Sequence, residues 1–222
     1  MKKIKISLLL FFAFLLITSG LEAHTINYDF NGMSKSAVGW VYLQMGFTHI
    51  LPLGLDHILF VLGLYLLSPK LKTVLIQATA FTIAHSITLG LAIFGFIQPL
   101  SSVIEPIIAL SIVFIAIENI ALPELKSGRL VIVFLFGLIH GCGFASALTE
   151  VGLPEKNYLV ALLTFNLGVE LGQVTILLAA FLLFGKWFGQ KVWYRQRIVI
   201  PLSVIIGCIA MYWTIERAFI IG

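Results

Sequence analysis

Long apolar runs separated by short polar joints make up the chain after residue 42. A bilayer core of about 30 Å needs about 20 apolar residues per helix, and six segments reach that length. We expect membrane-spanning helices at residues 43–67, 72–96, 99–121, 129–149, 157–184 and 198–219. Proline, glycine and charged residues mark the joints between them. The predicted fold class is therefore all-α: a polytopic transmembrane bundle of six helices, occupying residues 43–222.

The N-terminal segment has the pattern of a secretory signal peptide. A basic start, MKKIKIS, is followed by the apolar run LLLFFAFLLITSG and by Leu21-Glu22-Ala23, which has the small-residue ending of a cleavage site. We predict a signal peptide at residues 1–23 and a short extracytoplasmic segment at residues 24–42. The alternative is an uncleaved first transmembrane helix. In either case the next segment starts outside the membrane.

Composition agrees with a membrane protein and excludes several other classes. Hydrophobic residues make up 60% of the chain and charged residues only 11%, whereas soluble domains carry about 25% charged residues. The net charge of +4 comes from Lys and Arg clustered between apolar runs, so the expected partner is the lipid bilayer and not nucleic acid. Cys142 and Cys208 both lie inside apolar runs, which fits neither a disulfide framework nor a cysteine-rich zinc site.

The distribution of basic residues predicts the orientation, because cytoplasmic loops carry the excess of Lys and Arg. One set of alternate joints holds Lys70, Lys72, Lys126, Arg129, Lys186, Lys191, Arg195 and Arg197. The other set holds Lys35, Lys156 and Arg217. This contrast predicts that both ends of the mature chain lie outside.

Ionisable and amide side chains interrupt the apolar runs, and each of them costs free energy inside a bilayer. They are His49, Asp56, His57, His85, Glu105, Glu118, Asn119, His140, Asn166, Glu170 and Gln173. Counting the rise of about 1.5 Å per residue along each helix places five of them near the midplane: Asp56, His57, His85, His140 and Glu170. We therefore expect one shared polar site. Pro52 and Gly54 precede Asp56 and predict a local kink there.

Imidazole nitrogens together with carboxylate oxygens suit divalent first-row metals such as nickel, cobalt, copper or zinc. The alternative is that these groups only hold helices together through hydrogen bonds. That alternative suffices for Asn119 and Gln173, but two carboxylates and three imidazoles are more polar material than helix association requires. We therefore interpret the five residues as a metal site, without a choice of metal.

Five ordered segments carry a resemblance to a known family. They are HILPLGLDHILFVLGL, TAFTIAHSITL, VIEPIIALSIVFIAIEN, FGLIHGCGFASAL and FNLGVELGQ, and together they resemble the HupE/UreJ family of bacterial membrane proteins. Members are hydrogenase or urease accessory proteins, and characterised ones act as nickel permeases. The resemblance implies metal uptake across the bacterial inner membrane, with His49, Asp56 and His57 matching the family's motif. Six residues separate His49 from Asp56, where nickel permeases typically have five, so the metal stays open.

The leading hypothesis is a permease for a divalent metal ion, nickel or cobalt first and zinc next. In it, Asp56, His57, His85 and His140 form the ion site and Glu170 assists them. His49 and Glu105 form an outer entry, Glu118 lies at the inner exit, and Asn166 is a further pathway residue. The rivals are an intramembrane zinc hydrolase acting on a lipid and a non-transporting accessory protein of a nickel-enzyme maturation system. The sequence leaves open whether the protein is an enzyme.

Overall fold

Helices account for all the regular structure in the part of the chain that is described. The fold is known from a computed structural model, which describes residues 30, 32–145, 154 and 156–219. The helices are α2 (Lys35–Ile50), α3 (Leu55–Leu67), α4 (Leu71–Ile93), α5 (Ser101–Ala121), α6 (Arg129–Gly143), α8 (Tyr158–Ala180), α9 (Lys186–Phe188) and α10 (Ile200–Phe219). Two π-helical stretches, η1 (Phe181–Gly185) and η2 (Arg195–Val199), continue α8 into α9 and lead into α10. The all-α prediction is confirmed for these residues, while the predicted signal peptide lies outside them.

Four helical segments are long and apolar enough to cross a membrane. They are Leu71–Ile93, Ser101–Ala121, Tyr158–Phe188 and Arg195–Phe219. The pair α2 and α3 makes a fifth when it is counted as one bent span, whereas α6 has only 15 residues. The chain is therefore a multi-pass membrane protein, but six full spans are not confirmed. The end of the expected helix 129–149 falls partly outside the described residues.

The first expected span, 43–67, is two helices rather than one. α2 ends at Ile50, α3 begins at Leu55, and the two axes differ by 67°. Pro52 has no backbone N–H to donate, so it cannot continue the α-helical ladder. Gly54 lies against the backbone carbonyl of His49, where a Cβ would overlap the oxygen. The kink predicted at Pro52 and Gly54 is thus present as a complete break.

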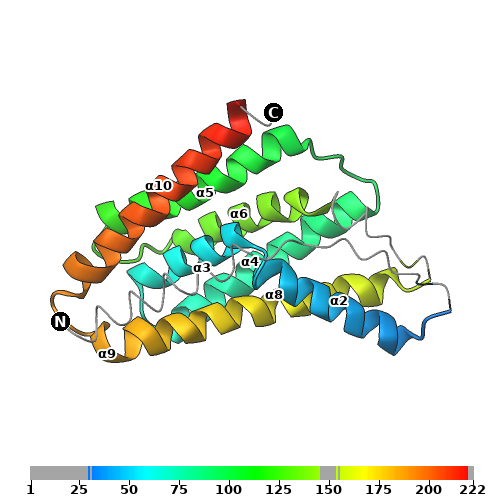
Figure 1. Cartoon of the computed structure of the whole chain (residues 1–222), viewed down its shortest axis with the longest axis horizontal. Coiled ribbons are helices and arrows are strands. Elements are labelled where there is room, and N and C mark those ends of the chain that lie inside the picture. The colour runs from blue at the N-terminus through cyan, green and yellow to red at the C-terminus, as the bar shows by residue number, and fades with distance from the viewer. Residues whose placement is uncertain (1–29, 31, 146–153, 155, 220–222) are drawn as a thin grey trace.

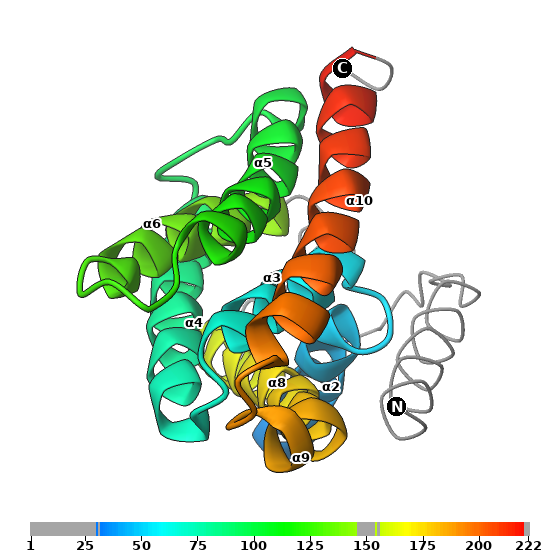
Figure 2. The ribbon, with the colours of Figure 1, turned by 90° about the vertical axis from the view of Figure 1, so that its left-hand side faces the viewer.

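Three pairs of helices make the most extensive contacts: α2 with α8, α4 with α6, and α5 with α10. Figure 1 shows α5 and α10 running side by side, and Figure 2 shows the same pair and the neighbouring α4 and α6 from another direction. Glycines allow the closest approaches. A Cβ at Gly46 or Gly168 would overlap the facing backbone of α8 or α2, and one at Gly137 or Gly141 would overlap that of α4. Small residues at crossings are typical of helices packed in a membrane.

Replacing Gly168 by alanine should destabilise the protein, because the added methyl group would overlap the carbonyl oxygen of Leu43 on α2. Overpacking of this kind costs about 1–3 kcal/mol. We expect a thermal midpoint several degrees lower for Gly168→Ala in detergent solution. Gly128→Ala is the matched control, since a Cβ there has no neighbour within 4 Å. Equal midpoints for the two variants would contradict the close contact of α2 with α8.

Candidate metal centre

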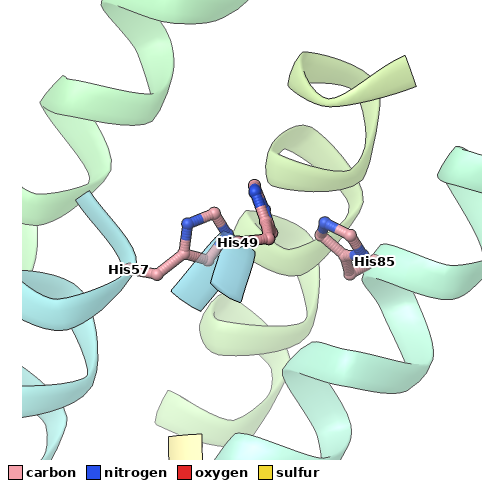
Figure 3. Close-up of side chains that lie close together, drawn as sticks. All are labelled: His49, His57 and His85. Atoms are coloured by element: carbon pink, nitrogen blue, oxygen red, sulfur yellow. The ribbon is translucent and has the colours of Figure 1, made fainter. Parts of the chain in front are cut away.

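Three histidines from three helices lie together inside the bundle (Figure 3). His49 belongs to the last turn of α2, His57 to the first turn of α3, and His85 to α4. One possible ligand atom from each lies within 4.8 Å of the other two. We call these three residues the histidine group. It is the one set of three or more His, Cys, Asp or Glu side chains with this geometry among residues 30, 32–145, 154 and 156–219.

The helix break brings the first two histidines together. His49 and His57 are eight positions apart, which in a straight helix would separate them by about 12 Å along the axis. Their ring centroids are instead 4.7 Å apart, edge to face. The 67° bend between α2 and α3 makes this contact possible. Both rings also lie close to His85, with centroids at 6.1 and 6.0 Å.

Asn166 of α8 orients the imidazole of His85. Its Nδ2 donates to the carbonyl of Leu162 at 2.8 Å, so its Oδ1 is the atom that faces His85, 3.3 Å from Nδ1. An amide oxygen can only accept, and Nδ1 of His85 therefore carries the ring proton. Nε2 is left with a free lone pair, the form in which imidazole binds metals. Histidines that bind metals usually donate their other ring N–H to an acceptor of this kind, which fixes the orientation of the ring.

His140 of α6 is fixed by a similar contact. The hydroxyl of Ser111 donates to the carbonyl of Ile108 at 2.7 Å, so its oxygen is left to accept from Nε2 of His140 at 3.0 Å. The lone pair of His140 is therefore on Nδ1. The His140 ring lies 5.0 Å from that of His57, between centroids. A fourth imidazole thus stands beside the histidine group.

The nitrogens that would bind a metal have no hydrogen-bond partner. Nε2 of His49, His57 and His85 and Nδ1 of His140 are all buried and unpartnered. A buried polar atom without a partner costs about 1–3 kcal/mol, so four of them in one place indicate a site built for a ligand. Nitrogen ligands on a tetrahedral ion at about 2 Å lie about 3.3 Å apart. The possible ligand atoms of the histidine group already lie within 4.8 Å of one another, so small side-chain movements would bring them to the spacing of about 3.3 Å.

Phenylalanine rings pack against the imidazoles of the histidine group and of His140. The ring of Phe144 lies 3.9 Å from that of His49 and stacks on Phe165. Phe81 contacts the rings of His57, His85 and His140, and Phe60 contacts His140. These four phenylalanines form an aromatic wall.

Asp56, expected in the ion site, is placed elsewhere. Its carboxylate accepts from both terminal nitrogens of Arg217 on α10, at 2.7 and 3.2 Å. Successive helical residues point about 100° apart, so Asp56 and His57 face different neighbours. Arg217 also reaches the backbone carbonyl of Glu105 at 3.5 Å. The structure thus gathers Asp56, Glu105 and Arg217 in a second polar cluster.

Glu170 and Glu118 also lie apart from the histidine group. Glu170 accepts from the hydroxyl of Thr79 at 2.7 Å. Glu118 pairs with Arg129 at 3.0 Å, and both side chains are almost fully buried. Asn119 extends this pair, since it accepts from Arg129 and donates to Gly63 and Ser203. Asn119 therefore has the helix-linking role predicted for it, and Glu118 belongs to the same network.

Sequence reasoning missed several residues that shape the centre. Arg217 entered the sequence analysis only through the charge distribution that predicts orientation. An arginine inside the apolar run 198–219 also predicts a buried acidic partner. The supporting role of Ser111 and the contacts of Phe144 carry no sequence signal, because they depend on how helices rotate about their axes. His49 was expected at an outer entry, whereas it lies in the histidine group itself.

The fold and the centre define a multi-pass membrane protein with a buried group of histidines able to bind a metal ion. A family model described as HupE / UreJ protein matches residues 27–217, and the chain belongs to that family. The comparisons with curated proteins and with solved structures give no match. The family relates the chain to metal handling, in agreement with the histidine group.

Replacing Asn166 by leucine should weaken metal binding, because it removes the acceptor that fixes the ring of His85. Loss of such second-sphere contacts typically lowers metal affinity 10- to 100-fold, and we expect about that loss. The measurement is competition with a chromophoric chelator in detergent solution. Thr164→Val is the control, since the Thr164 hydroxyl bonds only backbone carbonyls of its own helix. Unchanged affinity in Asn166→Leu would show that Asn166 does not support the ligand.

Replacing Glu118 by leucine should destabilise the fold without weakening metal binding. The change leaves Arg129 buried without its counter-charge, which costs about 3–5 kcal/mol, and no hydrogen bond or ion pair in the described residues joins Glu118 to the histidines. Thermal unfolding should show a lower midpoint, and metal titration an unchanged affinity. The double variant Glu118→Leu/Arg129→Met should recover much of the lost stability. An equally low midpoint for the double variant would argue against the ion pair as the cause.

Proposed function

We propose that this protein is a permease that carries a divalent transition-metal ion, nickel or cobalt first, through the histidine group. The observation that carries the proposal is the set of buried, unpartnered imidazole nitrogens where α2 breaks into α3. Broken helices at the centre of a bundle are the places where secondary transporters bind their substrates. Membership of the HupE/UreJ family supports a role in metal handling.

The chemistry of the ligands fits an ion that must also be released. Neutral imidazoles bind nickel, cobalt and zinc, and they bring no negative charge that would hold a dication permanently. Within the described residues, His49, His57 and His85 lie close enough to share an ion, and His140 lies next to His57 as a further ligand. We therefore assign binding to these four residues, with Asn166 and Ser111 as positioning residues.

Asp56 and Glu105 fit a role in attracting the ion rather than in holding it. They lie around Arg217 near the end of α10, which the charge pattern places toward the outside. Asp56 directly precedes His57 in the first turn of α3. A metal approaching His57 would compete electrostatically with Arg217 for the Asp56 carboxylate. In this proposal Asp56 becomes available to the ion only when Arg217 moves away.

The hydrolase alternative lacks a suitable general base in the described residues. A zinc hydrolase needs a carboxylate or a similar group within hydrogen-bond reach of the metal-bound water. Both oxygens of Asp56 are held by Arg217, and Glu170, whose Oε1 accepts from Thr79, is not part of the histidine group. The histidine group contains no carboxylate. The geometry therefore favours binding and passage of an ion over hydrolysis.

The proposal includes a location and a partner system. The family resemblance favours the bacterial inner membrane, and the charge pattern favours mature N- and C-termini on the outside. An accessory system that matures a nickel enzyme would be the consumer of the ion. The driving force would be an ion gradient, the membrane potential or metal trapping downstream, since the sequence holds no nucleotide-binding loop.

The test is uptake of nickel, cobalt, zinc and copper into proteoliposomes that contain the purified protein. We expect saturable uptake of at least one metal by the wild type. His57→Ala and His85→Ala should each lower it by about tenfold or more, because each removes a nitrogen from the three-ligand set. Thr48→Ala is the matched control, since Thr48 is exposed beside His49 and bonds only its own helix.

Absence of uptake of all four metals by the wild type would refute the permease. Wild-type uptake that persists unchanged in both histidine variants would refute the assignment of the site. Stoichiometric zinc retained by a protein without flux would instead favour the hydrolase.

A further inference from the structure

Glu170 is a carboxylate near the middle of a membrane-spanning helix without a cationic partner. It lies in α8, which belongs to the 31-residue apolar segment Tyr158–Phe188. Asp56 and Glu118 each have an arginine within 3.0 Å, and these are the two ion pairs found among the described residues. An uncompensated charge at this depth costs several kcal/mol. Glu170 therefore requires a different explanation from the other two acids.

The surroundings of Glu170 supply oxygen atoms and no nitrogen ligand of the imidazole type. Thr79 of α4 donates to Oε1 of Glu170 at 2.7 Å, while Oε2 is buried and has no partner. The hydroxyl of Thr82 donates to Oε1 of Gln173 at 3.2 Å. Gln173 is fully buried, and its Oε1 is the amide atom able to bind a cation. The α4–α8 interface thus holds a carboxylate, an amide and two hydroxyls that are only partly satisfied.

We propose that Glu170, Thr79, Thr82 and Gln173 form a second cation site, distinct from the histidine group, that binds a monovalent alkali cation, sodium. Carboxylate, hydroxyl and amide oxygens are hard ligands that suit alkali and alkaline-earth ions, whereas transition metals prefer the imidazoles one turn away. The site has a single negative charge. A monovalent cation would neutralise the carboxylate of Glu170 and leave no net charge at the site.

The two sites are close enough to influence each other. Asn166, which orients His85, precedes Glu170 by four residues on α8, a rise of about 6 Å. Thr82 similarly lies one turn from His85 on α4. Sodium would neutralise the Glu170 carboxylate, which otherwise attracts the metal ion at this distance, so sodium at Glu170 would favour release of the metal ion. That coupling rests on the proposed function, whereas the cation site itself does not.

The test compares thermal unfolding of the purified protein in sodium chloride and in N-methyl-D-glucamine chloride at equal ionic strength. A ligand that binds only the folded state raises its stability, and we expect a midpoint about 3 °C or more higher in sodium for the wild type. Glu170→Gln should lose this difference. Glu216→Gln is the matched control, because it makes the same change at a half-buried carboxylate on α10 that accepts from Tyr212, and it should keep the wild-type shift.

Binding of radioactive sodium to the same proteins provides a readout that does not depend on stability. We expect one saturable site in the wild type and in Glu216→Gln, weaker binding in Thr79→Val, and none in Glu170→Gln. Absence of the site from the wild type, or its retention in Glu170→Gln, would overturn the inference. Both results are independent of metal uptake, so failure of the permease assignment and failure of the sodium site are separate outcomes.

Discussion

The break between α2 and α3 is the constraint on which the histidine centre depends. Pro52 cannot donate a backbone hydrogen bond, and Gly54 lets the chain turn closely against the carbonyl of His49. The 67° change of direction then brings His49 to within 4.7 Å of His57, between ring centroids. An unbroken helix would keep the two rings about 12 Å apart along its axis. Without the break, His49 would not reach His57 and His85, and the histidine group would not form.

Buried polar groups in this bundle fall into two kinds with different consequences. The network of Glu118, Arg129 and Asn119 is largely satisfied within the protein, and it joins α3, α5, α6 and α10 through contacts to Gly63 and Ser203. Arg195 adds to it by donating to the last carbonyls of α5, where a cation is favourable to the helix dipole. The imidazoles differ, because their lone pairs point to no partner. Groups of the first kind link the helices, whereas groups of the second kind are free to bind the proposed metal ion.

The sequence predicts the helices well and the centre only in part. Apolar length located α4 at Leu71–Ile93 and α5 at Ser101–Ala121 within a few residues of the expected 72–96 and 99–121. Counting along helices indicated which residues share a depth, and His57, His85 and His140 do lie together. It could not indicate rotation about each axis, which turns Asp56 toward Arg217 and Glu170 toward Thr79. His49 was placed too far out because the count assumed a straight helix.

We propose that three or more imidazoles from separate helices hold one metal ion. X-ray absorption at the metal edge of nickel- or zinc-loaded protein tests it most directly, because imidazole rings give characteristic multiple scattering. We expect nitrogen or oxygen ligands at about 2.0–2.1 Å that include at least three imidazoles, and fewer imidazoles in His85→Ala. A shell made only of oxygen, or one that His85→Ala leaves unchanged, would contradict it.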